Sequence, residues 1–154
     1  MAVPKSVVRF RKNGVEYTSS VDRVNYTIVE LTRAALRDVG KYLARTANSK
    51  AMKLKGLKKS RRVRGRSSTF LYNVPWAKAG LPHLEVGVTH DTWYGVEQEL
   101  GSSKQPRREI LKKSANENIA TIVEIESKYL SALEDEAAAL RLIDEGEYSG
   151  GGDD

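Results

Sequence analysis

Few side chains in this sequence are suited to acid–base or metal chemistry. The chain has two histidines, His83 and His90, and no cysteine, which removes disulfides, thiolate catalysis and cysteine-based metal sites. On a strand, residues seven apart point to opposite faces, so the two histidines would not converge on one metal ion. His90-Asp91 has the order of an orienting pair, but no activated serine follows from the sequence. We interpret both histidines as surface or turn residues.

Closely spaced glutamates are the other candidates for catalysis or Mg²⁺ binding. They form two pairs, Glu97 with Glu99 and Glu124 with Glu126. Residues i and i+2 of a helix do not share a face, so we interpret these side chains as solvated or interface acids. A hydrolase or nuclease that uses Glu97, Glu99 and His90 is an alternative, and it predicts metal-dependent turnover that Glu97→Gln abolishes. In the interpretation that we favour, the protein has no catalytic site, no metal site and no cofactor.

A run of basic residues is the strongest local signal. Residues 48–68 contain no acid, and Gly56 and Gly65 would break a helix, so we expect a mobile, exposed loop. Such a loop suits sequence-independent, salt-dependent contact with nucleic acid, or a clamp on an acidic protein surface. Sequence-specific readout is not expected, because no recognition helix or zinc motif is present. The basic residues are Lys50, Lys53, Lys55, Lys58, Lys59, Arg61, Arg62, Arg64 and Arg66.

Large aromatic residues lie near the predicted loops. Trp76, Trp93 and Tyr94 could stack on bases or anchor a protein interface. We favour a core or interface role, because no basic residue directly flanks Trp93.

Charge is divided unevenly along the 154 residues, a length typical of one domain. Residues 1–123 contain 24 basic and 10 acidic residues, a net charge of +14, and residues 124–154 contain 2 and 10, a net charge of −8. This polarity predicts charged partners, including a second copy of the chain. We expect no membrane span, because no stretch of about 18 apolar residues exists. The first residues lack the apolar segment of a secretory signal.

The periodicity of the sequence predicts a set of short strands and two long helices. Asn13-Gly14 predicts a hairpin over 6–18, because both central turn residues need positive φ. Apolar residues at three- and four-residue steps predict a helix over 21–47, in which Gly40 would mark close packing against a sheet. Strands are expected at 69–74 and 83–89, a short helical turn at 92–100, and a helix from Pro106 to about 145, with a break near 134–136.

These elements predict an α+β fold without βαβ alternation. We expect a small antiparallel sheet, made from the N-terminal hairpin and the two central strands, packed on two long helices. Residues 1–145 would form the domain, and residues 146–154 a flexible acidic Gly-rich tail.

One string in the sequence resembles a known family. Residues 93–101 read Trp-Tyr-Gly-Val-Glu-Gln-Glu-Leu-Gly, and residues 105–108 read Gln-Pro-Arg-Arg before a predicted helix. With the upstream order of helix, basic segment and two strands, this is similar to the small tail-component family of siphophages, the head–tail joining or tail-completion proteins. The resemblance covers roughly residues 22–133.

The resemblance implies a structural virion protein without enzymatic activity or cofactor. Such proteins form rings, often of six subunits, at the neck between the head connector and the tail tube, around the DNA channel. The basic loop would then face the channel or an acidic adjoining ring, and the protein would assemble in the host cytoplasm. Subunit contacts would involve Trp93, Tyr94, Glu97, Glu99, Arg107 and Arg108. A small sequence-independent nucleic-acid-binding module is the alternative.

Overall fold

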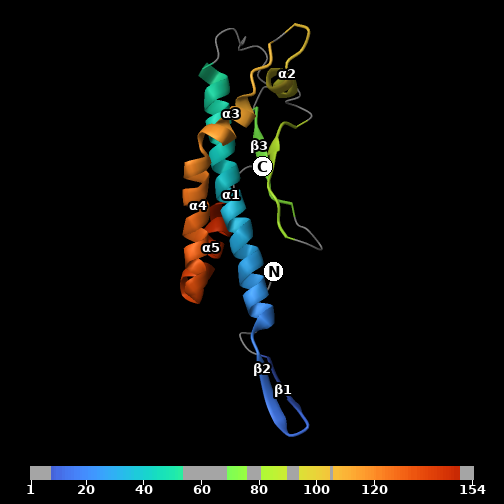
Figure 1. The fold of residues 1–154 in the computed structure, drawn as a ribbon, viewed down its shortest axis with the longest axis vertical. Helices are drawn as coiled ribbons and strands as arrows, with labels where there is room; N and C mark the ends of the chain where they lie inside the picture. Colours follow the sequence, from blue (N-terminus) through green and yellow to red (C-terminus); the bar gives the residue numbers. More distant parts are fainter. Residues whose placement is uncertain (1–7, 54–68, 76–80, 90–93, 105, 150–154) are drawn as a thin grey trace.

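A computed structural model describes residues 8–53, 69–75, 81–89, 94–104 and 106–149. The elements follow one another in a simple order (Figure 1). They are β1 (Val8–Lys12), β2 (Val15–Ser19), α1 (Val21–Lys53), β3 (Leu71–Asn73), β4 (Glu85–Gly87), α2 (Tyr94–Leu100), α3 (Ile110–Glu117), α4 (Ile119–Ser131), the 3-10 turn η3 (Ala132–Glu134) and α5 (Glu136–Ser149). The α+β class expected from the sequence is confirmed.

The long helix α1 is the axis of the molecule. It contacts α3, α4 and α5 as well as the β3–β4 pair, and Figure 1 shows α4 and the strands on different sides of it. The helix runs six residues beyond the predicted end at 47. The buried side chains of Ala47 and Ala51 explain the extension, because they continue the apolar stripe by one more turn. Lys50 and Lys53 therefore belong to a helix and not to the expected loop.

Two hydrophobic clusters hold other elements to α1. The first joins the middle of α1 to the C-terminal helices, through Leu31, Ala34, Ala35, Tyr129, Ala132, Ala139 and Ile143. The second joins the end of α1 to Phe70 and to the start of α3, through Ala47, Ala51, Phe70 and Ile110. Alanines supply much of both clusters, so the helices approach α1 closely.

The strands form two separate antiparallel pairs, and the single sheet expected from the sequence is wrong. The hairpin has the predicted turn, with φ of 52° at Asn13 and 79° at Gly14. However, β1 and β2 contact chiefly each other and lie beyond the first turn of α1, so they do not extend the β3–β4 pair (Figure 1). The β3–β4 pair packs on α1 at Gly40, where an added Cβ would lie 2.7 Å from Leu84 Cδ1. Close packing at Gly40 is thus confirmed.

The prediction of a second long helix that starts at Pro106 is wrong. Residue 106 lies before the helical segment, and Glu109 has a left-handed φ of 50°, so α3 begins only at Ile110. A further break falls at Asn118, between α3 and α4. The predicted break near 134–136 is confirmed by η3 and by the extended Asp135, after which α5 packs against α1. Residues 146–149 are helical rather than part of a loose tail, and the rest of that tail lies outside the described residues.

Candidate interaction surfaces

The basic segment is described only at its start. Lys53 is exposed at the end of α1, and Lys50, one turn earlier, forms an ion pair with Glu117 of α3. Lys50 thus helps join α1 to α3. The remaining basic residues of the segment, Lys55, Lys58, Lys59, Arg61, Arg62, Arg64 and Arg66, lie outside the described residues.

In the segment that carries the family resemblance, the described residues 94–104 and 106–109 connect α2 to α3 through a closed turn, which we call the clasp. The backbone N–H of Arg108 donates to the carbonyl of Gln98 at 3.0 Å, and that of Glu109 donates to the carbonyl of Glu99 at 3.3 Å. The turn between them needs glycine, because Gly101 has a φ of 80° and an added Cβ would lie 2.8 Å from Arg107 N. The segment is therefore a structural unit that fixes where α3 starts.

Glu99 caps α3 with both carboxylate oxygens. Oε2 accepts from the N–H of Leu111 at 2.8 Å, and Oε1 accepts from the N–H of Lys112 at 3.0 Å. These N–H groups belong to the first turn of a helix and have no intrahelical partner. The structure thus gives Glu99 an intramolecular task, which the sequence pattern did not indicate because the capped turn lies twelve residues away.

The other residues predicted to make subunit contacts are spread over the same region. Arg107 is exposed and its guanidinium lies 2.6 Å from Glu109 Oε1, while Arg108 and Glu97 are half-buried. Tyr94 is the first residue of α2, and Trp93 lies outside the described residues.

Gln98 is a residue of the clasp that sequence reasoning missed. Its side chain is only 4 % exposed. Its Oε1 has no hydrogen-bond partner in the described part of the chain, and the same is true of Arg108 Nη1. Burial of a glutamine inside a polar stretch gives no periodic signal, which explains why the sequence did not point to it.

The candidates for catalysis do not gather into a site in the described ranges. No group of three histidine, aspartate or glutamate side chains able to hold a metal ion occurs there. His83 is exposed and its Nε2 lies 3.3 Å from Glu85 Oε1, whereas His90 lies outside these ranges. Glu124 is exposed on α4, and Glu126 lines one end of a groove.

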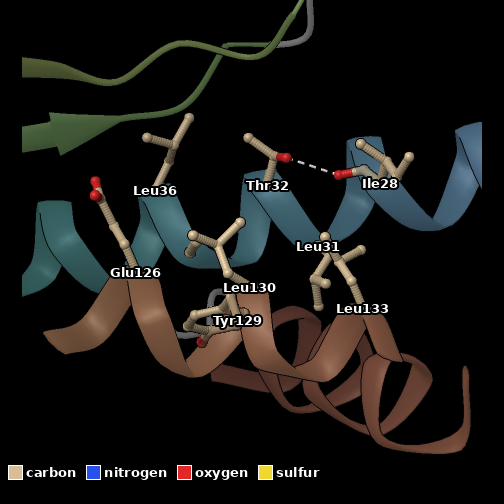
Figure 2. Close-up of a pocket in the computed structure, with 9 residues that line it drawn as sticks. Ile28, Leu31, Thr32, Leu36, Glu126, Tyr129, Leu130 and Leu133 are labelled. Atoms are coloured by element: carbon tan, nitrogen blue, oxygen red, sulfur yellow. Dashed lines mark hydrogen bonds between the residues drawn. The ribbon is translucent and has the colours of Figure 1, made fainter. Parts of the chain in front are cut away.

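That groove is an apolar surface between α1 and α4, which we call the α1–α4 groove (Figure 2). Its volume is about 250 Å³. Its lining is Ile28, Leu31, Thr32, Ala35, Leu36, Glu126, Tyr129, Leu130 and Leu133. Leu130 is 65 % exposed and Leu133 44 %, values that are high for large apolar side chains. Large exposed apolar patches mark sites of interaction with other molecules.

The exposed apolar side chains of α4 and η3 follow a regular spacing. Ile119, Val123, Leu130 and Leu133 are all exposed, and with Glu126 they recur at alternating four- and three-residue steps. Such spacing forms one stripe along a helix. The spacing of this stripe is visible in the sequence, but it does not tell whether the stripe is buried or exposed.

Tyr129 lies at the base of the groove and is itself buried. Its hydroxyl donates to Oδ2 of Asp38 on α1. Burial, with the hydrogen bond and the negative charge of Asp38, raises the pKa of Tyr129 well above its usual value. The pair holds α4 on α1 below the exposed apolar stripe.

None of the helices described is both long and apolar enough to cross a membrane. No family model, no curated protein and no solved structure matches the chain.

Proposed function

We propose that this chain is a structural virion protein of a tailed bacteriophage, which forms a ring, of about six subunits by its family resemblance, at the head–tail junction. The observation that carries the proposal is the α1–α4 groove, where large apolar side chains are exposed in a chain with 30 % charged residues. Contacts between identical subunits would cover such a surface. The resemblance of residues 93–101 to the siphophage tail-component family supplies the neck location and the DNA channel.

The charge distribution supports assembly of identical copies. Helix α1 contains seven basic and three acidic residues, whereas residues 119–149 contain two basic and eight acidic residues. A copy can therefore present a basic surface to the acidic helices of its neighbour. Contacts between two different surfaces of the same protein generate rings when the rotation closes. In this proposal the protein has no enzymatic activity and no cofactor, and its partners are the adjoining connector and tail-tube rings.

Electron microscopy tests this proposal directly. The purified chain would be imaged beside the particle that carries it, and its mass would be measured by analytical ultracentrifugation with and without the partner rings. A ring at the head–tail junction is the expected result and would give the stoichiometry. A chain that stays monomeric at high concentration with and without these partners, and is absent from any virion, would contradict the proposal.

The basic run from Lys50 to Arg66 favours a second candidate, a small sequence-independent nucleic-acid-binding module. This candidate predicts tight binding to free DNA that weakens with salt and is lost when Lys58, Lys59, Arg61 and Arg62 are replaced by alanine. The ring proposal predicts weak or no binding to free DNA and strong binding to connector or tail proteins. A gel-shift titration at two salt concentrations separates the two.

A further inference from the structure

The β1–β2 hairpin extends from the body of the protein (Figure 1). Only Ser20 separates β2 from α1, and its carbonyl accepts from the N–H of Val24 at 3.0 Å, so the first turn of α1 begins at once. The hairpin lies beyond the start of α1, and its strands contact chiefly each other (Figure 1). A two-stranded hairpin alone is only marginally stable in water, so it needs another surface to cover it.

The register of the hairpin separates residue types by position. Phe10 pairs with Tyr17 and Lys12 with Val15, while Arg9 pairs with Thr18 and Arg11 with Glu16. Directly opposed residues share a face of an antiparallel ribbon, and successive residues alternate between faces. The positions of residues 8, 10, 12, 15, 17 and 19 thus fall on one face, where four are apolar or aromatic types and the other two are Lys12 and Ser19. Val15 is 53 % exposed, so this face is open at that position.

The α1–α4 groove matches the hairpin in length and charge. A five-residue strand is roughly 17 Å long, and the exposed stripe from Ile119 to Leu133 spans roughly 21 Å of helix. Residues 8–19 contain three basic residues and one acid, a net charge of +2, whereas residues 119–134 contain three acids and one basic residue, a net charge of −2. Glu126 lies at the groove itself, and Glu124 and Glu134 are exposed on the same elements.

We propose that the β1–β2 hairpin of one copy docks on the α1–α4 groove of a neighbouring copy. The apolar positions of the ribbon cover Leu130 and Leu133, and Lys12, which shares their face, lies toward the acids of α4 and η3. Arg9 and Arg11 lie on the opposite face of the ribbon. Because the hairpin and the groove are different surfaces, each copy inserts its hairpin into the groove of one neighbour and receives the hairpin of another neighbour in its own groove. This inference rests on the proposed self-assembly and names the surfaces that carry it.

Cysteine cross-linking tests the contact, and because the chain has no cysteine of its own, every disulfide must involve an introduced cysteine. Two single variants, Val15→Cys and Leu130→Cys, would be purified separately, mixed and oxidised, and the cross-linked dimer measured on a denaturing gel. Leu81→Cys, at a residue 74 % exposed and outside both surfaces, replaces Leu130→Cys in the control mixture. Circular dichroism would verify that each variant is folded.

The expected result is a mixed Val15–Leu130 dimer at least tenfold more abundant than the Val15–Leu81 product. Val15→Asp and Leu130→Glu should each weaken self-association at least tenfold in ultracentrifugation, and Leu81→Glu should not change it. If assemblies form but Leu130→Cys cross-links mainly to itself, α4 pairs with α4 and the hairpin inference fails while the ring proposal stands. A chain that remains monomeric with and without its partner rings overturns both.

Discussion

The hydroxyl of Tyr42 on α1 donates to Oδ1 of Asn118 at 2.7 Å, at the point where α3 ends and α4 begins. Asn118 also uses its side-chain N–H₂ to reach the carbonyl of Ser114 at 2.8 Å. One side chain thus joins the end of α3 to α1 while its backbone, at φ −118°, leaves the helical conformation. The position of the break between α3 and α4 is fixed by this pair.

Tyr42→Phe should therefore lower the free energy of unfolding by about 1 kcal/mol, the net contribution of one partly buried hydrogen bond. Asn118→Ala should cost more, about 2 kcal/mol, because both of its hydrogen bonds are lost. Urea denaturation followed by circular dichroism measures both values. If Asn118→Ala were stabilising, the pair would not fix the break and a continuous helix would be preferred.

The cap at Glu99 gives a second prediction. Glu99→Ala leaves two N–H groups of the first turn of α3 without their acceptor and should cost about 1–2 kcal/mol. Glu99→Gln keeps one amide oxygen as acceptor and should lie between Glu99→Ala and the wild type. The matched control is Glu124→Ala, an exposed glutamate of α4, which should change stability by less than about 0.5 kcal/mol. Equal values for Glu99→Ala and the control would show that the cap does not stabilise α3.

Local signals in the sequence were sufficient for the hairpin and for the start of α1, and they located β3 and β4 inside longer predicted strands. Asn13-Gly14 set the turn of the hairpin by its φ requirement, and the three- and four-residue steps marked the buried face of α1. Non-local contacts decided the rest. The start of α3 depends on Glu99 and on the left-handed Glu109, and the break at Asn118 depends on Tyr42, 76 residues away. No window of sequence contains such pairs.

For the interaction surfaces, too, local sequence signals predicted one part and non-local packing decided the other. The basic segment was visible as a charge run, but where helix α1 ends within it depended on the burial of Ala51. The α1–α4 groove was missed, because an apolar stripe on α4 looks identical in sequence whether it is buried or exposed. Only the packing of α5 against α1, through Ala139 and Ile143, shows that the core is completed without Leu130 and Leu133.

Gly40 gives a third prediction, in which two effects oppose each other. Alanine is favoured over glycine in a helix by about 1 kcal/mol. However, the added Cβ would lie 2.7 Å from Leu84 Cδ1 and 2.9 Å from Tyr72 Cγ, and overpacking of this kind costs about 1–3 kcal/mol. Because the tyrosine ring carbon is close to its backbone, we expect steric repulsion to dominate, and Gly40→Ala to be destabilising.

Gly87→Ala is the matched control for this packing argument. Gly87 pairs with Leu71 in the β3–β4 sheet, and an added Cβ there would have no atom within 4 Å. This variant should be neutral or slightly stabilising, because alanine loses less backbone entropy on folding than glycine. Urea denaturation of both variants compares the two positions. If Gly40→Ala proved as stable as Gly87→Ala, the strands would not be packed tightly on α1.

The Tyr129–Asp38 pair gives a prediction about alkaline pH. Burial and the neighbouring Asp38 carboxylate raise the pKa of Tyr129 in the folded protein, whereas in the unfolded chain it stays near the ordinary value of about 10. Above that pH the unfolded chain releases the proton while the folded protein retains it. The stability that Tyr129 contributes is therefore complete below about pH 10 and falls as the pH rises further.

Tyr129→Phe isolates this effect, because all other tyrosines are common to both proteins. At neutral pH the variant should be about 1–3 kcal/mol less stable, since the Asp38 carboxylate loses a charge-assisted hydrogen bond. Urea denaturation from pH 8 to pH 11 should show the difference between the two proteins shrinking above pH 10. A difference that stayed constant over this range would mean that Tyr129 titrates alike in the folded and unfolded states, and that the buried pair at the base of the groove does not form in solution.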